Sequence, residues 1–211
     1  MNVWHRIGRQ LAHPKGYAGR IAGSAMGIAN RRANALAIDA LRIAPHDDIL
    51  ELGFGPGHAI ERLAALAPFG TIYGVDRSAV MLDQARKRNA AAMRCGRIHL
   101  KQCEFDSIPL PDSSVDKILA VNVIYFWADA GRILREARRV LRPDGLVSIY
   151  ATDASAMRHW KFAGPETHRL FDADGLAEAL HRGAFDRDRV DVVRIKAGPG
   201  VAGLIARIEK R

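Results

Sequence analysis

The sequence predicts an α/β fold in which a doubly wound, mostly parallel sheet ends in an antiparallel hairpin. Three observations support this prediction. Short apolar runs alternate with stretches of helical periodicity between residues 48 and 182. A glycine-rich turn, Gly53–Gly57, follows the first of these runs. Only a few turn residues separate the last two runs, which is too short for the crossover that parallel neighbours need.

The first 45 residues are expected to form a helical cap. Helical patterns cover Val3–Leu11 and Ile21–Leu41, and His13-Pro14-Lys15-Gly16 interrupts them. Residues 1–42 hold seven Lys/Arg and one acid, so they carry +6 of the net charge of +9. Such a segment attracts acidic small molecules, phospholipid headgroups or nucleic acid, although a basic face can also serve only solubility.

The sheet core is expected over residues 46–211, and its elements follow from apolar periodicity and the breaks in it. Apolar runs bounded by turn residues predict strands at Asp48–Leu52, Thr71–Val75, Arg97–Gln102, Asp116–Val121, Leu146–Ala151, Val190–Lys196 and Val201–Ile208. Longer periodic stretches predict helices at His58–Ala67, Ser78–Asn89, Ala130–Leu141 and Ala173–Arg182. Proline and glycine predict turns at Pro68-Phe69-Gly70, Arg142-Pro143-Asp144-Gly145 and Gly198-Pro199-Gly200. With no internal repeat or long linker, one domain spanning residues 1–211 is expected.

Composition excludes several classes of protein. A chain of 211 residues with 48% hydrophobic content can bury a full core. No apolar run approaches the roughly 20 residues of a membrane span. The N-terminus lacks the apolar segment of a secretory signal, so a cytoplasmic location is expected. The two cysteines, Cys95 and Cys103, form no CxxC pair, and no His/Cys cluster has zinc spacing, so no metal site is expected.

The glycine turn predicts where a ligand binds. In an open α/β sheet, ligands lie beyond the carboxyl ends of the strands, and this turn leaves the first strand there. Its three glycines, Gly53, Gly55 and Gly57, allow the backbone to approach a ligand closely. The helix that begins near His58 directs its N-terminal amides at the same place.

Two further positions are suited to a nucleotide. Asp76 ends the second strand, 19 residues after Gly57, and its carboxylate can accept hydrogen bonds from both hydroxyls of a ribose. After the third strand, Glu104 can accept from an exocyclic amine, and Phe105 can contact a purine ring.

Four segments together resemble the ordered motifs of class I S-adenosylmethionine-dependent methyltransferases: ELGFGPG, GVDRSAVMLDQAR, CEFDSIPLPDSSVDKILAVNVIYFWAD and EARRVLRPDGLVSIY. The resemblance covers roughly residues 46–210. It implies a Rossmann-like sheet of seven strands, S-adenosyl-L-methionine as cofactor, and methyl transfer by in-line displacement.

The resemblance also implies a role for each matching residue. Glu51, with the three glycines, corresponds to the loop around the methionine part of the cofactor. Asp76 corresponds to the ribose ligand, with Arg77 beside it, and Glu104 and Phe105 correspond to the adenine contacts. Asn122 begins the strand end, Asn122 to Tyr125, that faces the sulfonium in this family.

The acceptor is expected to be a small molecule or lipid, with an anionic group favoured by the basic cap. Nucleic acid is not expected, because the chain has no appended nucleic-acid-reading domain. Peripheral membrane contact through residues 1–42 is an expectation as well, because Trp4, Ile7 and Leu11 share one helical face. Candidate acceptor-contacting residues are Tyr17, Asn30, Arg31, Tyr125, His159, Trp160 and His168. No residue is assigned as catalytic base.

Two other classes of function stay open at this stage. A nicotinamide-dependent oxidoreductase would need its third glycine where this chain has His58, and no Tyr-Lys hydride-transfer pair is evident. A basic nucleic-acid- or membrane-binding module with a degenerate cofactor site agrees with the N-terminal charge. It does not explain why Glu51, the three glycines and Asp76 occur together.

Overall fold

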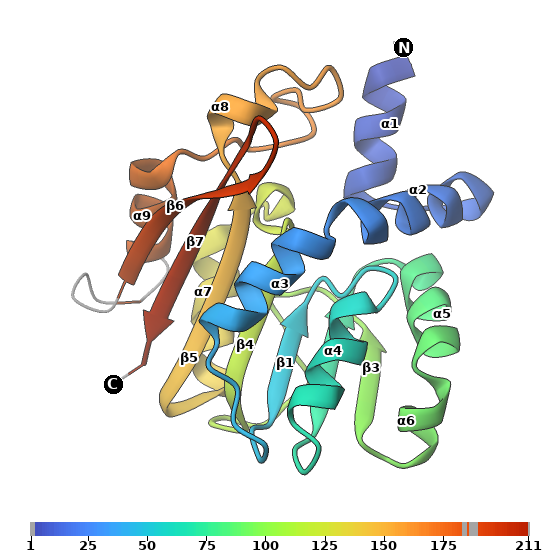
Figure 1. Ribbon diagram of the computed structural model, residues 1–211, viewed down its shortest axis with the longest axis vertical. Helices are drawn as coiled ribbons and strands as arrows, with labels where there is room; N and C mark the ends of the chain where they lie inside the picture. Colours follow the sequence, from blue (N-terminus) through green and yellow to red (C-terminus); the bar gives the residue numbers. More distant parts are fainter. Residues whose placement is uncertain (1–2, 183–184, 186–189, 211) are drawn as a thin grey trace.

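Seven strands form one sheet in the computed structural model (Figure 1). The structure describes residues 3–182, 185 and 190–210, apart from the side chains of residues 6, 17, 20, 22, 24, 25 and 28. The strand order is β3-β2-β1-β4-β5-β7-β6. The strands are β1 (Ile49–Leu52), β2 (Ile72–Asp76), β3 (Ile98–Gln102), β4 (Val115–Val121), β5 (Leu141–Thr152), β6 (Val190–Gly198) and β7 (Val201–Glu209). The first five pair in parallel, and β7 is antiparallel to both β5 and β6. The predicted fold class is confirmed.

Helices cover both faces of the sheet (Figure 1). The helices of the described residues are α1 (Val3–Ala12), α2 (Gly16–Ala29), α3 (Arg31–Ala40), α4 (His58–Leu66), α5 (Ala79–Arg88), α6 (Ala90–Arg94), α7 (Ala130–Val140), α8 (Ala154–Met157) and α9 (Ala173–His181), with a 3-10 turn, η1 (Ile124–Phe126). Neighbouring strand residues point to opposite faces, so Ile118 packs in the apolar cluster under α7 and α9, and Leu119 packs in the one under α3, α4 and α5. No helix among the described residues is both long and apolar enough to span a membrane.

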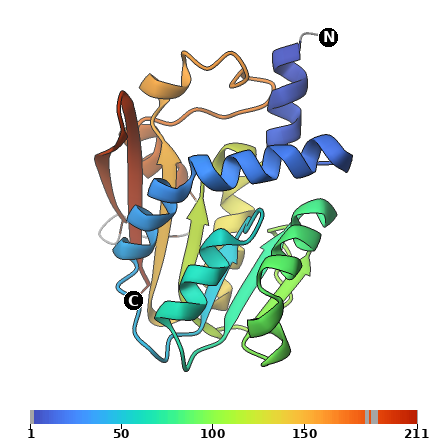
Figure 2. The same ribbon diagram turned by 45° about the vertical axis from the view of Figure 1, so that its right-hand side comes forward.

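The predicted single helix Ile21–Leu41 is wrong. The structure has two helices there, α2 and α3, and they meet at Asn30, where ψ of 0° departs from helical geometry. Helix α2 also begins earlier than predicted, at Gly16. The bend directs α3 onto the sheet and leaves α2 over the strand ends (Figure 2).

The predicted start of the fifth strand at Leu146 is wrong, because α7 ends at Val140 and β5 already begins at Leu141, although Asp144 has a left-handed φ of 61°. Pairing with β4 shifts between Leu141 and Leu146, which indicates a bulge at this point. Lys210 exchanges backbone hydrogen bonds with Asp144 and Gly145. These contacts extend the strand across the bulge.

Helix α2 approaches its neighbours through glycines. A Cβ on Gly23 would lie 2.6 Å from Cε of Met81, and one on Gly27 would lie 2.4 Å from the ring of His58. The two glycines are one turn apart on the same side of the helix. This spacing brings the α2 backbone directly onto the start of α4 and onto α5, over the carboxyl ends of the parallel strands (Figure 2).

Candidate functional site

The glycine turn lies where the strand order reverses. Strand β1 pairs with β2 on one side and β4 on the other, so the turn after β1 opens at the topological switch point. All three glycines have positive φ. A Cβ on Gly57 would lie 2.9 Å from Cα of Ala85, whereas one on Gly55 would meet nothing within 4 Å. Gly57 is therefore required for packing, and Gly55 presents open backbone to the site.

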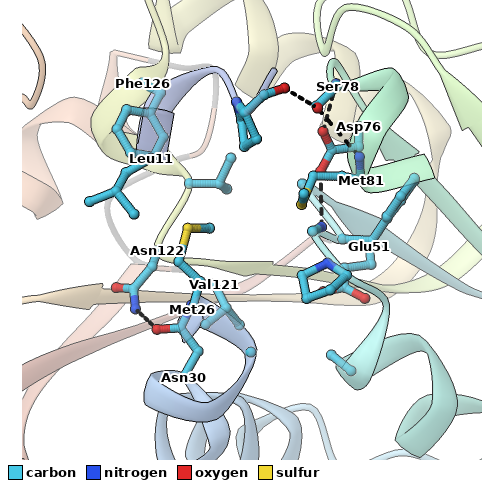
Figure 3. A pocket seen from close by; sticks show the side chains of 18 of the residues that line it. Leu11, Met26, Asn30, Glu51, Asp76, Ser78, Met81, Val121, Asn122 and Phe126 are labelled. Atoms are coloured by element: carbon cyan, nitrogen blue, oxygen red, sulfur yellow. Dashed lines mark hydrogen bonds between the residues drawn. The ribbon is translucent and has the colours of Figure 1, made fainter. Parts of the chain in front are cut away.

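A cavity of about 80 Å³ lies between this turn and the helical cap (Figure 3). Asp76, Ser78 and Glu51 lie on one side of it, and Leu11, Phe126 and Asn122 lie on the other. Pockets for ligands of nucleotide size hold roughly 300–1,000 Å³. The cavity in this structure is therefore smaller than such a ligand.

Two hydrogen bonds hold the cap over the cavity. The Ser78 hydroxyl donates to the carbonyl oxygen of Pro14 at 2.7 Å, and Nδ2 of Asn122 donates to Oδ1 of Asn30 at 2.9 Å (Figure 3). The two bonds link β2 and β4 to opposite ends of α2. They are the contacts that cap movement would strain or break.

Glu51 is a buried acid at the end of β1. Burial raises its pKa from 4.5 to about 8, and the nearby charge of Asp76 adds to the effect. Its Oε2 atom has no hydrogen-bond partner within the described part of the chain. A buried oxygen without a partner is costly, and a ligand that brings an N–H donor removes the cost. The site thus fits an ammonium group such as that of a methionine moiety.

Asp76 ends β2 and organises the turn. Its Oδ2 accepts from the Gly55 N–H at 2.9 Å, and its Oδ1 accepts from the Ser78 N–H at 2.8 Å. Burial raises the pKa of Asp76, and these two backbone donors oppose the rise. A carboxylate accepts about four hydrogen bonds, so Asp76 keeps acceptor capacity beyond these backbone donors for a ligand hydroxyl.

The residues predicted to contact adenine are only partly brought together. Phe105 is buried and lines the cavity, and the Arg77 guanidinium lies 5.5 Å from its ring centroid. Glu104 pairs with Arg77 at 3.8 Å, but its side chain is 68% exposed and does not line the cavity. A role for Glu104 in binding adenine stays a prediction.

Asn122 occupies the end of β4 with a left-handed φ of 53°. Its Oδ1 accepts hydrogen bonds from the Tyr125 hydroxyl at 2.8 Å and from the Thr152 backbone and hydroxyl, both at 3.2 Å. The side chain thus ties β4, β5 and the cap together at the cavity wall. Tyr125 lies outside the cavity, and its hydroxyl is engaged in this network.

The other predicted acceptor residues fall in different places. Asn30 lines the cavity. The Tyr17 side chain lies outside the described part of the structure. His159 and Trp160 line a separate groove beside the β6–β7 turn. His168 lines a neighbouring cleft together with Tyr125.

Sequence reasoning missed what the cap contributes to the cavity. The missed lining residues include Leu11, Ala12, His13, Pro14, Met26 and Asn34. Glycines four residues apart in α2 are the one signal in the sequence that could have indicated close packing of this helix over the site. Burial and the Arg77 charge lower the pKa of His13, so this missed residue is neutral at pH 7.

These features define a class of protein. The structure brings together a glycine turn at the switch point, a buried carboxylate bonded to that turn and a buried acid whose Oε2 has no partner in the described part of the chain. This arrangement is typical of an α/β protein that binds a nucleotide-like ligand beyond the strand ends.

Comparison with known proteins agrees with this class. A family model described as a methyltransferase domain matches residues 50–149. The uncharacterized methyltransferase YdaC of Bacillus subtilis is 30% identical over 168 residues, which cover 80% of this chain and 88% of YdaC. The ubiquinone/menaquinone biosynthesis C-methyltransferase UbiE of Geotalea daltonii is 32% identical over 114 residues, 54% of this chain and 48% of that protein. A SAM-dependent methyltransferase structure from Aquifex aeolicus has a TM-score of 0.66 at 19% identity, covering 83% of this chain and 89% of that one.

The chain belongs to the class I S-adenosylmethionine-dependent methyltransferase family, and its cofactor is S-adenosyl-L-methionine. The sequence-based prediction of the family is confirmed. The nicotinamide-dependent oxidoreductase is thereby set aside.

A matched pair of glycine variants tests the turn. Gly55→Ala and Gly200→Ala both place a methyl group in open space at positive φ, 51° and 67°. Both should lose about 1–2 kcal/mol of unfolding free energy in denaturant titrations. Only Gly55→Ala should weaken S-adenosylmethionine binding, by about tenfold in calorimetry, because Gly55 lines the cavity and Gly200 does not. Equal affinity in the two variants would contradict this placement.

Proposed function

We propose that this methyltransferase acts on a small-molecule or lipid acceptor that carries a negative charge. The observation that supports the proposal best is a second, larger hollow beside the cofactor cavity, the acceptor cleft. It lies between α1 with the start of α2 and η1 with residues 165–169, and it measures about 1,350 Å³.

The cofactor residues have distinct roles in this proposal. Glu51 holds the ammonium group, the backbone at Gly55 faces the methionine part, Asp76 binds the ribose hydroxyls and Phe105 contacts the adenine ring. S-adenosylmethionine, when bound, supplies a methyl group already activated on a positive sulfur. The chain then has to align the acceptor and exclude water, so proximity supplies most of the rate enhancement.

The acceptor cleft adjoins the cofactor cavity. Leu11, Ala12, His13 and Phe126 line both hollows and so form the boundary between them. An acceptor in the cleft would therefore reach the cofactor past the ring of Phe126, at the end of the cavity that also holds Asn122 (Figure 3).

The lining of the cleft favours an anion with an apolar body. Its apolar residues are Val3, Ile7, Leu11, Ala12, Ala18, Ile21, Phe126, Trp127 and Ala128. Three basic residues join them: Arg9, Lys15 and Arg169. Among the described residues, the lining contains one acid, Glu166, which lies 3.2 Å from Nδ1 of His5, so the Lys and Arg side chains outnumber the acids. The UbiE relative, named for quinone biosynthesis, supports a small-molecule acceptor.

The rim of the acceptor cleft supports delivery of the acceptor from a lipid surface. Val3 and Ile21 are each 58% exposed, and Trp4 and Ile7 are 38% and 39% exposed. The three residues of the predicted apolar face of α1 therefore have different surroundings. Leu11 lines the cavity, whereas Trp4 and Ile7 remain partly exposed. Apolar side chains among basic ones are typical of peripheral membrane contact.

The proposal is tested by supplying S-adenosylmethionine with a labelled methyl group to the protein together with a cell extract. The extract is divided into lipid, small-molecule, protein and nucleic-acid fractions. Label is expected in the lipid or small-molecule fraction. Label confined to protein or nucleic acid would overturn the proposal.

Charge removal in the cleft gives a second readout of the same assay. The double variant Arg9→Gln/Lys15→Gln should raise the KM for the labelled acceptor about fivefold, because exposed ion pairs contribute roughly 0.2–1 kcal/mol each. The effect should shrink in 0.5 M salt, where exposed charges are screened. The control Lys87→Gln/Arg94→Gln removes the same charge from exposed positions outside the cleft and should leave the KM unchanged. Equal KM values in both double variants would contradict the role of cleft charge.

A further inference from the structure

His168 sits at the inner end of the acceptor cleft. It lines the cleft, is 5% exposed, and lies in the segment between α8 and α9. Its ring packs edge-on against Phe126 with centroids 4.9 Å apart, and it lies 5.9 Å from the ring of Tyr125. Since Phe126 forms part of the boundary with the cofactor cavity, the imidazole is one ring away from that cavity.

A neighbouring hydroxyl contacts one nitrogen of the His168 ring. Nδ1 lies 3.0 Å from Oγ1 of Thr167. Two carbonyl oxygens, those of Phe162 and Gly164, lie 3.1 Å from that hydroxyl, and its single proton can be donated to either. When the proton goes to a carbonyl, the hydroxyl oxygen accepts from Nδ1, which places the imidazole proton on Nδ1 and leaves a lone pair on Nε2.

Helix α1 keeps Thr167 in this arrangement. A Cβ on Gly8 would lie 2.5 Å from the Phe162 carbonyl oxygen and 3.0 Å from Oγ1 of Thr167. The glycine thus lets the α1 backbone pack directly on the two groups that orient the hydroxyl. This contact leaves Thr167 little room to turn.

Nε2 of His168 has no hydrogen-bond partner within the described part of the chain. Unlike Nε2 of His181, it is not among the fully buried polar atoms of that part, so a ligand can reach it. Burial lowers the pKa of His168 to about 4, so the ring stays neutral at pH 7. An acceptor atom in so apolar a place gains most from a ligand that supplies an O–H or N–H.

We propose that His168 binds the methyl acceptor, with Nε2 accepting a hydrogen bond from a hydroxyl or uncharged amine group at the inner end of the cleft. The inference rests on the proposed function, because it names the group by which the same acceptor is recognised. The acceptor then combines three features: an anionic group, an apolar body and a hydrogen-bond donor. A carboxylate or a quaternary ammonium has no proton to offer and does not satisfy this nitrogen.

Two fluorescent naphthoates serve as probes, because each combines a carboxylate with an apolar two-ring body. Binding of 6-hydroxy-2-naphthoate and of 2-naphthoate is measured with the full-length protein in the presence of S-adenosylhomocysteine. The hydroxyl compound should bind about tenfold tighter, as expected for one added hydrogen bond to a buried acceptor. In His168→Phe the ratio of the two affinities should fall to about one, because phenylalanine keeps a ring in this place but has no lone pair to accept a hydrogen bond.

Two further variants make the test specific. His159→Phe removes a histidine from a groove outside the acceptor cleft and should retain the tenfold preference. Thr167→Val removes the hydroxyl that sets the tautomer and should reduce the preference while leaving His168 in place. In the unsubstituted protein, the ¹⁵N imidazole spectrum at pH 7 should show His168 neutral with its proton on Nδ1.

The inference is overturned if the spectrum places the proton on Nε2, or if the unsubstituted protein shows no preference between the two probes. It is also overturned if His168→Phe keeps the preference. Each of these results can occur while labelled methyl still enters the lipid or small-molecule fraction, in which case the proposed function stands. Label confined to protein or nucleic acid would instead remove the proposed function itself.

Discussion

Asp76→Ala is expected to lower the affinity for S-adenosylmethionine at least a hundredfold. Hydrogen bonds to a charged group contribute roughly 1.5–3 kcal/mol each, and the carboxylate is the proposed acceptor for the ribose hydroxyls. The variant also releases the Gly55 N–H, so the turn around the methionine part loses its tie to β2. Calorimetric titration with the cofactor measures the loss.

Glu104→Ala is the matched control for this variant. It also removes a carboxylate near the cofactor cavity, but one whose side chain is 68% exposed and outside the lining. Its effect on affinity should therefore be much smaller than that of Asp76→Ala. Circular dichroism checks that both variants are folded. A folded Asp76→Ala that binds the cofactor normally would refute the ribose assignment.

Glu51→Gln is expected to alter two pH dependences. In the unsubstituted protein the free energy of unfolding should fall, and the affinity for the cofactor should rise, as pH increases. The pKa of Glu51 is raised from 4.5 to about 8 in the folded protein. The unfolded chain therefore releases this proton above pH 4.5, whereas the folded chain holds it until about pH 8. The folded state binds more protons between these values, so this group lowers the free energy of unfolding as pH rises from 4.5 to 8.

Each pH unit in that window corresponds to about 1.4 kcal/mol from this one group. Glutamine does not titrate, so Glu51→Gln should show a shallower decline of stability between pH 5 and pH 8. Denaturant titrations at several pH values measure the difference. Glu104→Gln, which removes an exposed carboxylate, should keep the slope of the unsubstituted protein.

Cofactor binding should show the reverse dependence. An ammonium group pairs with the ionised form of Glu51, so affinity should rise as pH increases towards 8, with a proton released on binding. Glu51→Gln has no such charge and should bind about a hundredfold more weakly at pH 8, with no rise. An unchanged pH dependence of affinity would show that Glu51 does not meet the ammonium group.

Local sequence patterns were sufficient to predict the sheet and the grouping of the glycine turn with two buried acids. A glycine turn after a short strand, an acid just before it and another acid at the end of the next strand are local patterns. Parallel strand ends meet at one edge of a sheet, so these local patterns were enough to place Glu51, Gly55 and Asp76 together. The hairpin of β6 and β7 followed in the same way, from the length of its turn.

The way the cap closes over the cavity depends instead on contacts between segments far apart in the sequence. The hydrogen bond from Ser78 to Pro14 joins residues 64 apart, and that from Asn122 to Asn30 joins residues 92 apart. No local propensity encodes either contact. The packing of α1 on residues 162–167 is likewise a contact between distant segments, because a Cβ on Gly8 would lie 3.0 Å from Oγ1 of Thr167. Local patterns specify strands and turns, whereas contacts between distant segments form only once the chain has folded, and these contacts shape the acceptor side of the site.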